Sequence, residues 1–130
     1  MEPEQLKSIP LFQTVSDEEL SQIAPFADEV HVDAGTRLVR EGDFSYEFFA
    51  IEEGDAEVTR EGDHVADLGP GDFFGEIGLL EKDLRTASVE AKSEMRLITL
   101  TGWDMKRMEK AMPEAVARVR EVLETRRPEA

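Results

Sequence analysis

The sequence predicts a mainly β fold of the α+β kind: a jelly-roll-like β-roll with helices at both ends. Two observations support this prediction. Between residues 29 and 100, short strand-like runs are separated by turn signals at intervals of about 8–12 residues. On either side, residues 1–28 and 101–127 show the apolar spacing of helices. A βαβ fold would need longer helical crossovers, so a pair of sheets fits the pattern better.

Length and composition fit one globular domain over residues 1–130. Of these 130 residues 40% are apolar, which is enough to bury a core. Acidic residues outnumber basic ones by 30 to 15, and the net charge of -15 argues against nucleic acid and anionic membranes as partners. Cysteine is absent, and no apolar run reaches the length of about 18 residues that spans a membrane. We therefore expect a cytoplasmic protein without disulfides and without membrane insertion.

The first zone, residues 1–28, is a helical lead-in. Ser16 followed three residues later by Glu19 forms a capping box, which marks the start of a short helix. Leu11 and Phe12 precede this cap and are expected to anchor the entry of the segment. The apolar residues that recur at helical spacing after the cap, and that should face the core, are Leu20, Ile23, Ala24 and Ala27.

The second zone, residues 29–100, is the β region. Val30 and Val32 alternate with polar neighbours, and clear strand-like runs occupy Glu47–Ile51, Ala56–Arg60 and Met95–Leu100. The acidic residues between Glu52 and Glu57 are interpreted as a solvated strand edge rather than a calcium site. The turn signals between the runs lie at residues 33–35, 41–43, 53–55, 61–63 and 69–72.

The third zone, residues 101–127, is helical again. Thr101 with Asp104 forms a second capping box, and Pro113 suits the first turn of a following helix. That helix carries an apolar stripe, for which we consider core packing first, then a lid over a ligand or the seam of a homodimer. The stripe consists of Val116, Val119 and Leu123, with Val122 beside it.

Residues 73–89 break the strand pattern and carry the candidate binding chemistry. Gly75 and Gly78 permit close approach of a ligand to the backbone, and free N–H groups in a first helical turn favour an anion. Arg85 adds a planar cationic fork that suits a phosphate. Glu76 suits a sugar hydroxyl instead, because a carboxylate accepts hydrogen bonds. Together these groups describe a ligand with one phosphate and one ribose hydroxyl.

The letters FGEIGLL at residues 74–80, followed by RTASV at residues 85–89, resemble the phosphate-binding cassette of cyclic nucleotide-binding domains. That family includes regulatory subunits of protein kinase A, cyclic-nucleotide-gated channels and the bacterial catabolite activator protein. The resemblance extends over about residues 8–125, because the lead-in helix, the β-turn landmarks and the two final helices also match. It implies a β-roll with a short cassette helix and two C-terminal helices that act as hinge and lid.

The resemblance also implies roles for individual residues. Glu76 would accept a hydrogen bond from the ribose 2′-hydroxyl, and Arg85 would pair with the cyclic phosphate. Backbone N–H groups, among them those of Ile77, Gly78 and Thr86, would complete the phosphate cradle. The candidate ligand-binding residues are Gly75, Glu76, Ile77, Gly78, Arg85, Thr86 and Ala87.

Three positions distinguish this cassette from the usual family pattern. Leu84 replaces a common proline, and Gly78 replaces a common alanine. Thr86 carries a hydroxyl, which in some members accompanies cyclic GMP, but bacterial members do not follow that rule. The expected ligand is therefore cyclic AMP, with cyclic GMP second.

Other interpretations remain open at this level. Arg85 could be a surface strand residue paired with Glu76 or Glu81, and the domain could be a ligand-free protein-interaction module of the same fold. A cupin-like metalloenzyme is a third alternative, but it needs a histidine cluster, and the chain has only His31 and His64, far apart in sequence. We expect no catalytic residue, no metal and no cofactor apart from the nucleotide ligand.

The expected function is therefore a sensing module in which ligand binding changes the position of the C-terminal helices. The sequence holds no segment that reads out such a signal, so we expect a stand-alone sensor or a fragment of a longer protein, acting on an effector protein of unknown identity. Residues 101–130 are near neutral and form the expected docking face. A homodimer through the last helix is the other partner considered.

Overall fold

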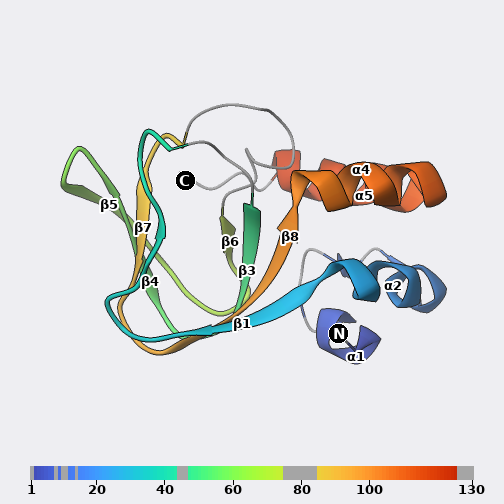
Figure 1. Cartoon of the computed structure of the whole chain (residues 1–130), viewed down its shortest axis with the longest axis horizontal. Helices are drawn as coiled ribbons and strands as arrows, with labels where there is room; N and C mark the ends of the chain where they lie inside the picture. Colours follow the sequence, from blue (N-terminus) through green and yellow to red (C-terminus); the bar gives the residue numbers. More distant parts are fainter. Residues whose placement is uncertain are drawn as a thin grey trace.

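Two four-stranded antiparallel sheets form the centre of the computed structural model (Figure 1). The structure describes residues 2–7, 9, 12, 13, 15–43, 47–74 and 85–125, with side chains up to residue 121. Sheet A has the order β1-β8-β3-β6, and sheet B has the order β2-β7-β4-β5. The strands are β1 (Asp28–Val32), β2 (Arg37–Val39), β3 (Glu47–Glu53), β4 (Ala56–Arg60), β5 (Asp63–Leu68), β6 (Phe73–Phe74), β7 (Ser88–Ala91) and β8 (Met95–Thr101).

The helices lie together on one side of the sheet pair, next to β1 and β8 and away from β4, β5 and β7 (Figure 1). Both expected capping boxes are present: Ser16 with Glu19 begins α2, and Thr101 with Asp104 begins α4. The sequence pattern did not predict the short helix α1 as a separate element. The helical elements are α1 (Pro3–Lys7), α2 (Asp17–Ile23), the 3₁₀ turn η2 (Ala24–Phe26), α4 (Gly102–Ala111) and α5 (Pro113–Thr125).

Sheet A separates two apolar cores, because its residues alternate between the two faces of the sheet. Phe48 and Ala50 of β3 face the helices, whereas Phe49 and Ile51 face sheet B. The neighbouring strand β6 shows the same division. Its Phe73 ring centroid lies 5.6 Å from that of Phe48 in the helix-side core, and Phe74 stacks on Phe49 at 5.0 Å in the core between the sheets.

The structure describes two of the four side chains in the apolar stripe on the last helix. Val116 and Val119 are 2% and 1% exposed and pack in the helix-side core, so core packing is confirmed for both. A homodimer seam that relies on exposure of Val119 is therefore wrong for that residue. The side chains of Val122 and Leu123 lie outside the described residues. Among the described helices, none combines the length and the apolar character needed to cross a membrane.

Candidate ligand-binding site

The candidate cassette connects the two sheets. It leaves sheet A at β6, which pairs with β3 through Phe49–Phe74 and Ala50–Phe73, and it enters sheet B at β7. Of the seven candidate ligand-binding residues, the structure describes Arg85, Thr86 and Ala87. The other four, Gly75 to Gly78, and the expected cassette helix lie outside the described residues.

The backbone of Arg85 is fixed by the turn that follows β2. Its N–H donates to the carbonyl of Asp43 at 2.8 Å, and its carbonyl accepts from the N–H of Gly42 at 3.0 Å. Gly42 has φ +87°, a conformation that glycine adopts without steric strain. The turn signal at residues 41–43 therefore has a function in this fold, since it holds the arginine in place from a distant part of the chain.

The side chain of Arg85 is nearly buried, at 6% exposure. Its Nη2 donates to the backbone carbonyl of Glu47 at 2.5 Å. Glu47 begins β3 and pairs directly with Thr101, which is the N-cap of α4. The interpretation of Arg85 as a surface residue is therefore wrong, and the pairing with Glu76 or Glu81 that went with it lies outside the described residues. Glu47 therefore connects the guanidinium of Arg85 to Thr101, the residue at which the C-terminal helices begin.

The two residues after Arg85 differ in environment. Thr86 is exposed, whereas Ala87 is fully buried in the core between the sheets. The carbonyl of Thr86 accepts a hydrogen bond from Nε of Arg60, the last residue of β4, at 3.1 Å. Sequence reasoning did not select Arg60. Its only signal was a basic side chain at the end of a predicted strand, and nothing in the sequence showed that β4 ends beside the cassette.

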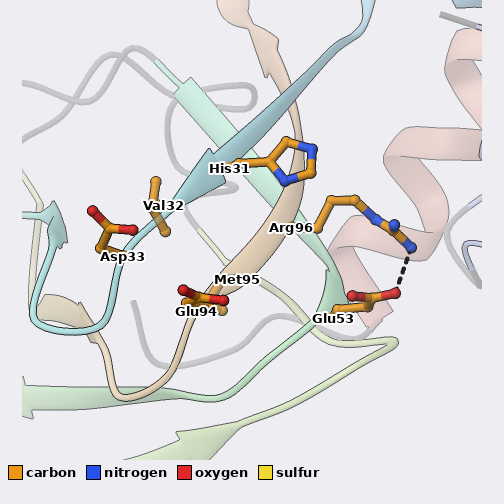
Figure 2. A pocket seen from close by; sticks show the side chains of 7 residues that line it. All are labelled: His31, Val32, Asp33, Glu53, Glu94, Met95 and Arg96. Carbon is orange, nitrogen blue, oxygen red and sulfur yellow. Dashed lines mark hydrogen bonds and ion pairs between the residues drawn. The ribbon is translucent and has the colours of Figure 1, made fainter.

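A second polar region lies at the opposite end of β8 from Thr101. A surface hollow there is lined by His31, Val32, Asp33, Glu53, Glu94, Met95 and Arg96 (Figure 2). Nη2 of Arg96 donates to Glu53 at 2.7 Å, and its Nε lies 3.7 Å from the Glu52 carboxylate. Because Glu53 and Glu47 are at the two ends of β3, this hollow is separate from the Arg85 site.

Two carboxyl groups next to this hollow have opposite pKa shifts. Burial, followed by repulsion from Glu29, raises the pKa of Glu52 above its ordinary value. The hydrogen bond with His31 holds the pKa of Glu29 below its ordinary value, and Gln5 of α1 donates to the same carboxylate at 2.6 Å. Of this pair, Glu29 therefore loses its proton at the lower pH and Glu52 at the higher pH.

The two histidines lie in different sheets, His31 on β1 of sheet A and His64 on β5 of sheet B. They do not share a site, so the histidine cluster that a cupin-like metalloenzyme requires is not formed. Their partners are carboxylates on neighbouring residues and strands: His31 lies 3.0 Å from Glu29, and His64 lies 2.8 Å from Glu57.

Comparisons with known proteins agree with this arrangement. A cAMP-dependent protein kinase regulatory subunit from Schizosaccharomyces pombe is 35% identical over 95 residues, which cover 72% of this chain and 23% of that protein. A cGMP-dependent protein kinase from Drosophila melanogaster is 37% identical over 94 residues, covering 68% of this chain and 10% of the kinase. The chain thus spans about a quarter or less of the length of these relatives.

A solved structure gives the same result at the level of the fold. The N-terminal domain of a transcriptional regulator from Streptomyces coelicolor A3(2) superposes with a TM-score of 0.81 at 26% identity, covering 93% of this chain and 90% of that one. The family model of the cyclic nucleotide-binding domain matches residues 29–111, which contain α4 and all of both sheets except the first residue of β1. The chain therefore belongs to the cyclic nucleotide-binding domain family.

Proposed function

We propose that this chain is a regulatory module that binds cyclic AMP, with cyclic GMP as the second candidate, and that binding changes the position of α4 and α5. The observation that supports this most directly is Arg85, a nearly buried guanidinium held by a turn and by the first residue of β3. A cation fixed in this way is suited to a single phosphate.

The proposed contacts follow the family pattern. Arg85 pairs with the cyclic phosphate, Glu76 accepts from the ribose 2′-hydroxyl, and backbone N–H groups of Ile77, Gly78 and Thr86 surround the phosphate oxygens. Gly75 and Ala87 leave room for the backbone to approach the ligand. The proposal assigns no catalytic residue and no resident cofactor, and the output passes to an effector protein.

The relation between ligand and helices rests on the start of β3. Arg85 bonds to the carbonyl of Glu47, and Glu47 pairs with Thr101 at the beginning of α4. A ligand that draws the guanidinium toward its phosphate competes with the Glu47 carbonyl for the same donors. We propose that this competition is one route by which binding biases the position of α4, since a ligand moves an equilibrium only through a difference in its contacts between the two states.

The test of binding is thermal unfolding of the full chain with cyclic AMP, cyclic GMP and, as a control, the acyclic nucleotide 5′-AMP. We expect cyclic AMP to raise the melting temperature most and 5′-AMP least. At a ligand concentration of 100 times the Kd, binding adds about 2.7 kcal/mol to the free energy of unfolding. If neither cyclic nucleotide raises the melting temperature, the ligand-free interaction domain is the better assignment.

The test of the helix movement uses the single tryptophan of the chain. Trp103 is on the first turn of α4, is 66% exposed, and has Nζ of Lys106 at 5.6 Å from its ring centroid. If α4 moves, its emission spectrum should shift on addition of cyclic AMP and remain constant with 5′-AMP. Calorimetric binding without any change in Trp103 emission would contradict the proposed movement and leave the binding proposal intact.

A further inference from the structure

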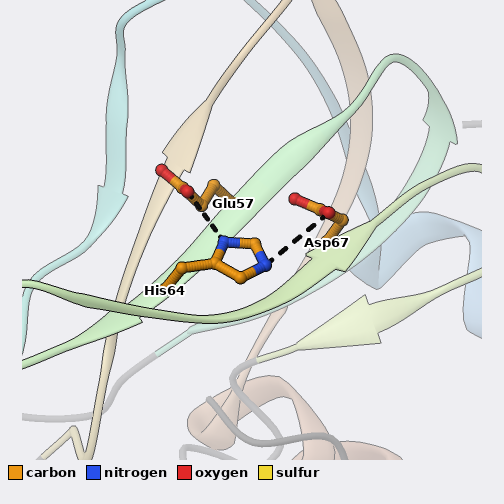
Figure 3. A group of neighbouring side chains, drawn as sticks. All are labelled: Glu57, His64 and Asp67. Atoms are coloured by element: carbon orange, nitrogen blue, oxygen red, sulfur yellow. Dashed lines mark hydrogen bonds and ion pairs between the residues drawn. The ribbon is translucent and has the colours of Figure 1, made fainter.

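Three side chains of metal-ligating type converge on the outer face of sheet B, away from Arg85. Glu57 is on β4, and His64 and Asp67 are on the neighbouring edge strand β5 (Figure 3). The imidazole lies between the two carboxylates. Its Nδ1 is 2.8 Å from Oε2 of Glu57, and its Nε2 is 3.7 Å from Oδ2 of Asp67.

A β-bulge brings His64 to this position. Glu57 is directly opposite Asp67 and Val58 is opposite Ala66, so a regular ladder would place Val65 opposite Thr59. The register shifts between Val58 and Thr59, and His64 takes that place instead. A bulge re-aims the side chains that follow it. Here it places the imidazole on the face that already carries the two carboxylates.

The same face has an excess of negative charge. Glu57 is directly opposite Glu90 of β7 as well as Asp67 of β5, so three carboxylates form a row across three neighbouring strands. Like charges directly opposite one another destabilise a sheet. Two cations compensate much of this row: Lys92, with its Nζ 3.2 Å from Glu57 and 3.6 Å from Glu90, and Arg37 of β2, which is directly opposite Glu90. The His64 hydrogen bond, followed by that of Lys92, holds the pKa of Glu57 below its ordinary value, so this carboxylate is ionised at neutral pH, as a metal ligand must be.

We propose that Glu57, His64 and Asp67 bind a divalent first-row transition metal ion of the zinc class. One ligand atom from each residue lies within 4.8 Å of the others. With metal–ligand bonds of about 2.0–2.2 Å, ligand atoms on a tetrahedral ion are about 3.4 Å apart, so the ligand atoms must approach one another by up to about 1.4 Å. His64 and Asp67 have side chains that are 50% and 79% exposed, which leaves them free to make that movement.

The ligand set selects the class of metal. An imidazole nitrogen with two carboxylates suits zinc, whereas calcium and magnesium prefer sites made only of oxygen ligands. One ring nitrogen of His64 binds the ion, so the ring turns out of its bridging position between the carboxylates. The fourth coordination position goes to water, because the site is on an open face of the sheet.

The composition of the chain makes the experiment simple to interpret. The sequence has two histidines and no cysteine, so any zinc site with an imidazole ligand must use His64 or His31. The test is calorimetric titration of zinc chloride into the full chain without a histidine tag. We expect one zinc ion per chain, at least a tenfold loss of affinity in His64→Ala, and no more than a twofold change in His31→Ala.

His31→Ala is a matched control because His31 also lies beside a carboxylate on an exposed strand face, 3.0 Å from Glu29. Two further variants test the geometry. Asp67→Asn should weaken zinc binding, and Lys92→Ala should strengthen it several-fold, because the ammonium group competes with the metal for Glu57. Equal zinc affinity in the wild type and His64→Ala, or an equal loss in both histidine variants, would overturn the proposal.

Cobalt(II) provides a second measurement on the unmodified chain. A tetrahedral site should give visible absorption bands that titrate to one equivalent and disappear when zinc is added in excess. Absence of these bands together with absence of calorimetric zinc binding would also overturn the proposal. Arg85→Ala should retain full zinc affinity, so a failure of the zinc proposal can be distinguished from a failure of the nucleotide-binding proposal.

Discussion

Arg85 is a nearly buried cation that hydrogen-bonds to backbone groups from two other segments of the chain. Its guanidinium donates to the Glu47 carbonyl, and its own peptide group is fixed by Asp43 and Gly42. These bonds come from the turn after β2 and from the first residue of β3, so two distant segments of the chain fix the position of this cation.

Replacement of this residue gives the first prediction. Arg85→Ala should weaken binding of cyclic AMP at least tenfold, because a charge-assisted hydrogen bond contributes about 1.5–3 kcal/mol and about 1.4 kcal/mol corresponds to tenfold. Arg85→Lys should lose less, since it keeps the charge and loses the planar fork. Titration calorimetry measures both variants, with circular dichroism to verify the fold. Unchanged affinity in Arg85→Ala would reject the assigned role.

Gly54 gives a prediction about stability. It has φ +95° after β3, and a Cβ built there would lie 2.7 Å from Cγ of Met95 and closer still to the carbonyl of Glu94. Gly54→Ala should therefore lower the free energy of unfolding by about 2–5 kcal/mol, through backbone strain and overpacking. Gly62→Ala is the control: at φ +84° nothing lies within 4 Å of the added Cβ, so only the strain of about 1–2 kcal/mol remains. Urea unfolding that gives equal losses would contradict the steric argument.

At the residue scale, the sequence was enough to select Arg85 as a candidate phosphate-binding residue, but not to predict which residues surround its side chain. The spacing of glycines, glutamate and arginine is local information, and it was sufficient to propose a phosphate site. The contact with Glu47 and the bond from Arg60 to Thr86 join residues 38 and 26 positions apart. Such contacts depend on how the strands pair, and a single sequence contains no direct record of that pairing.

At the scale of elements, the capping boxes define where helices begin. In α2, Ser16 accepts from the N–H of Glu19 at 3.2 Å, and Glu19 accepts from the N–H of Ser16 at 3.1 Å. The same carboxylate forms an ion pair with Arg118 of α5. Glu19 thus links the start of α2 to α5, because one carboxylate takes part in both the helix cap and the ion pair.

Ser16→Ala tests the cap. It should lower the free energy of unfolding by about 1 kcal/mol, because an unsatisfied N–H group remains at the first turn of a seven-residue helix. Ser21→Ala, in the same helix, is the matched control. Its hydroxyl bonds back to the carbonyl of Asp17, an interaction that adds little to a helix, so we expect almost no loss. Thermal unfolding of both variants side by side measures the difference.

The ends of the strands show where the apolar pattern of the sequence stops predicting the structure. Ala56–Arg60 was predicted with the bounds that the structure has, whereas β3 continues two residues beyond Ile51 and β8 one residue beyond Leu100. These extra residues are polar, so the apolar pattern ended before the ladder did. The helix α1 has only five residues, of which Leu6 is the buried apolar one, and a single apolar residue gives no periodicity.

At the scale of the whole molecule, carboxyl groups with raised and with lowered pKa values change the free energy of unfolding in opposite directions as the pH changes. The raised pKa of Glu52 contributes stability that is present at low pH and is lost as the pH rises through the folded-state value. The lowered pKa values of Glu19 and Glu29 contribute stability that is present at neutral pH and is lost on acidification. The cause is the backbone N–H of Ser16 for Glu19 and the His31 hydrogen bond for Glu29.

Glu52→Gln separates these effects. The substitution removes the cost of ionising a buried carboxyl group next to Glu29, so the melting temperature should rise by a few degrees at pH 7. At pH 4 the wild-type group holds its proton, and the two proteins should melt within about 1 °C of each other, since the differential charge effect vanishes there. Glu53→Gln, on the same strand with a more exposed side chain, is the control. An equal rise at both pH values would contradict this account.

The division of the protein into two cores has a consequence for hydrogen exchange. Sheet A is the common wall, with the helices packed on one face and sheet B on the other. Detachment of the helices would open the first core and leave the second closed. Amides of α2, α4 and α5 should then exchange through a partial opening of low free energy, while amides of β4, β7 and β8 exchange only on global unfolding. If a nucleotide shifts the helices as proposed, the free energy of that partial opening sets the difference in contacts between the two states that the nucleotide has to supply.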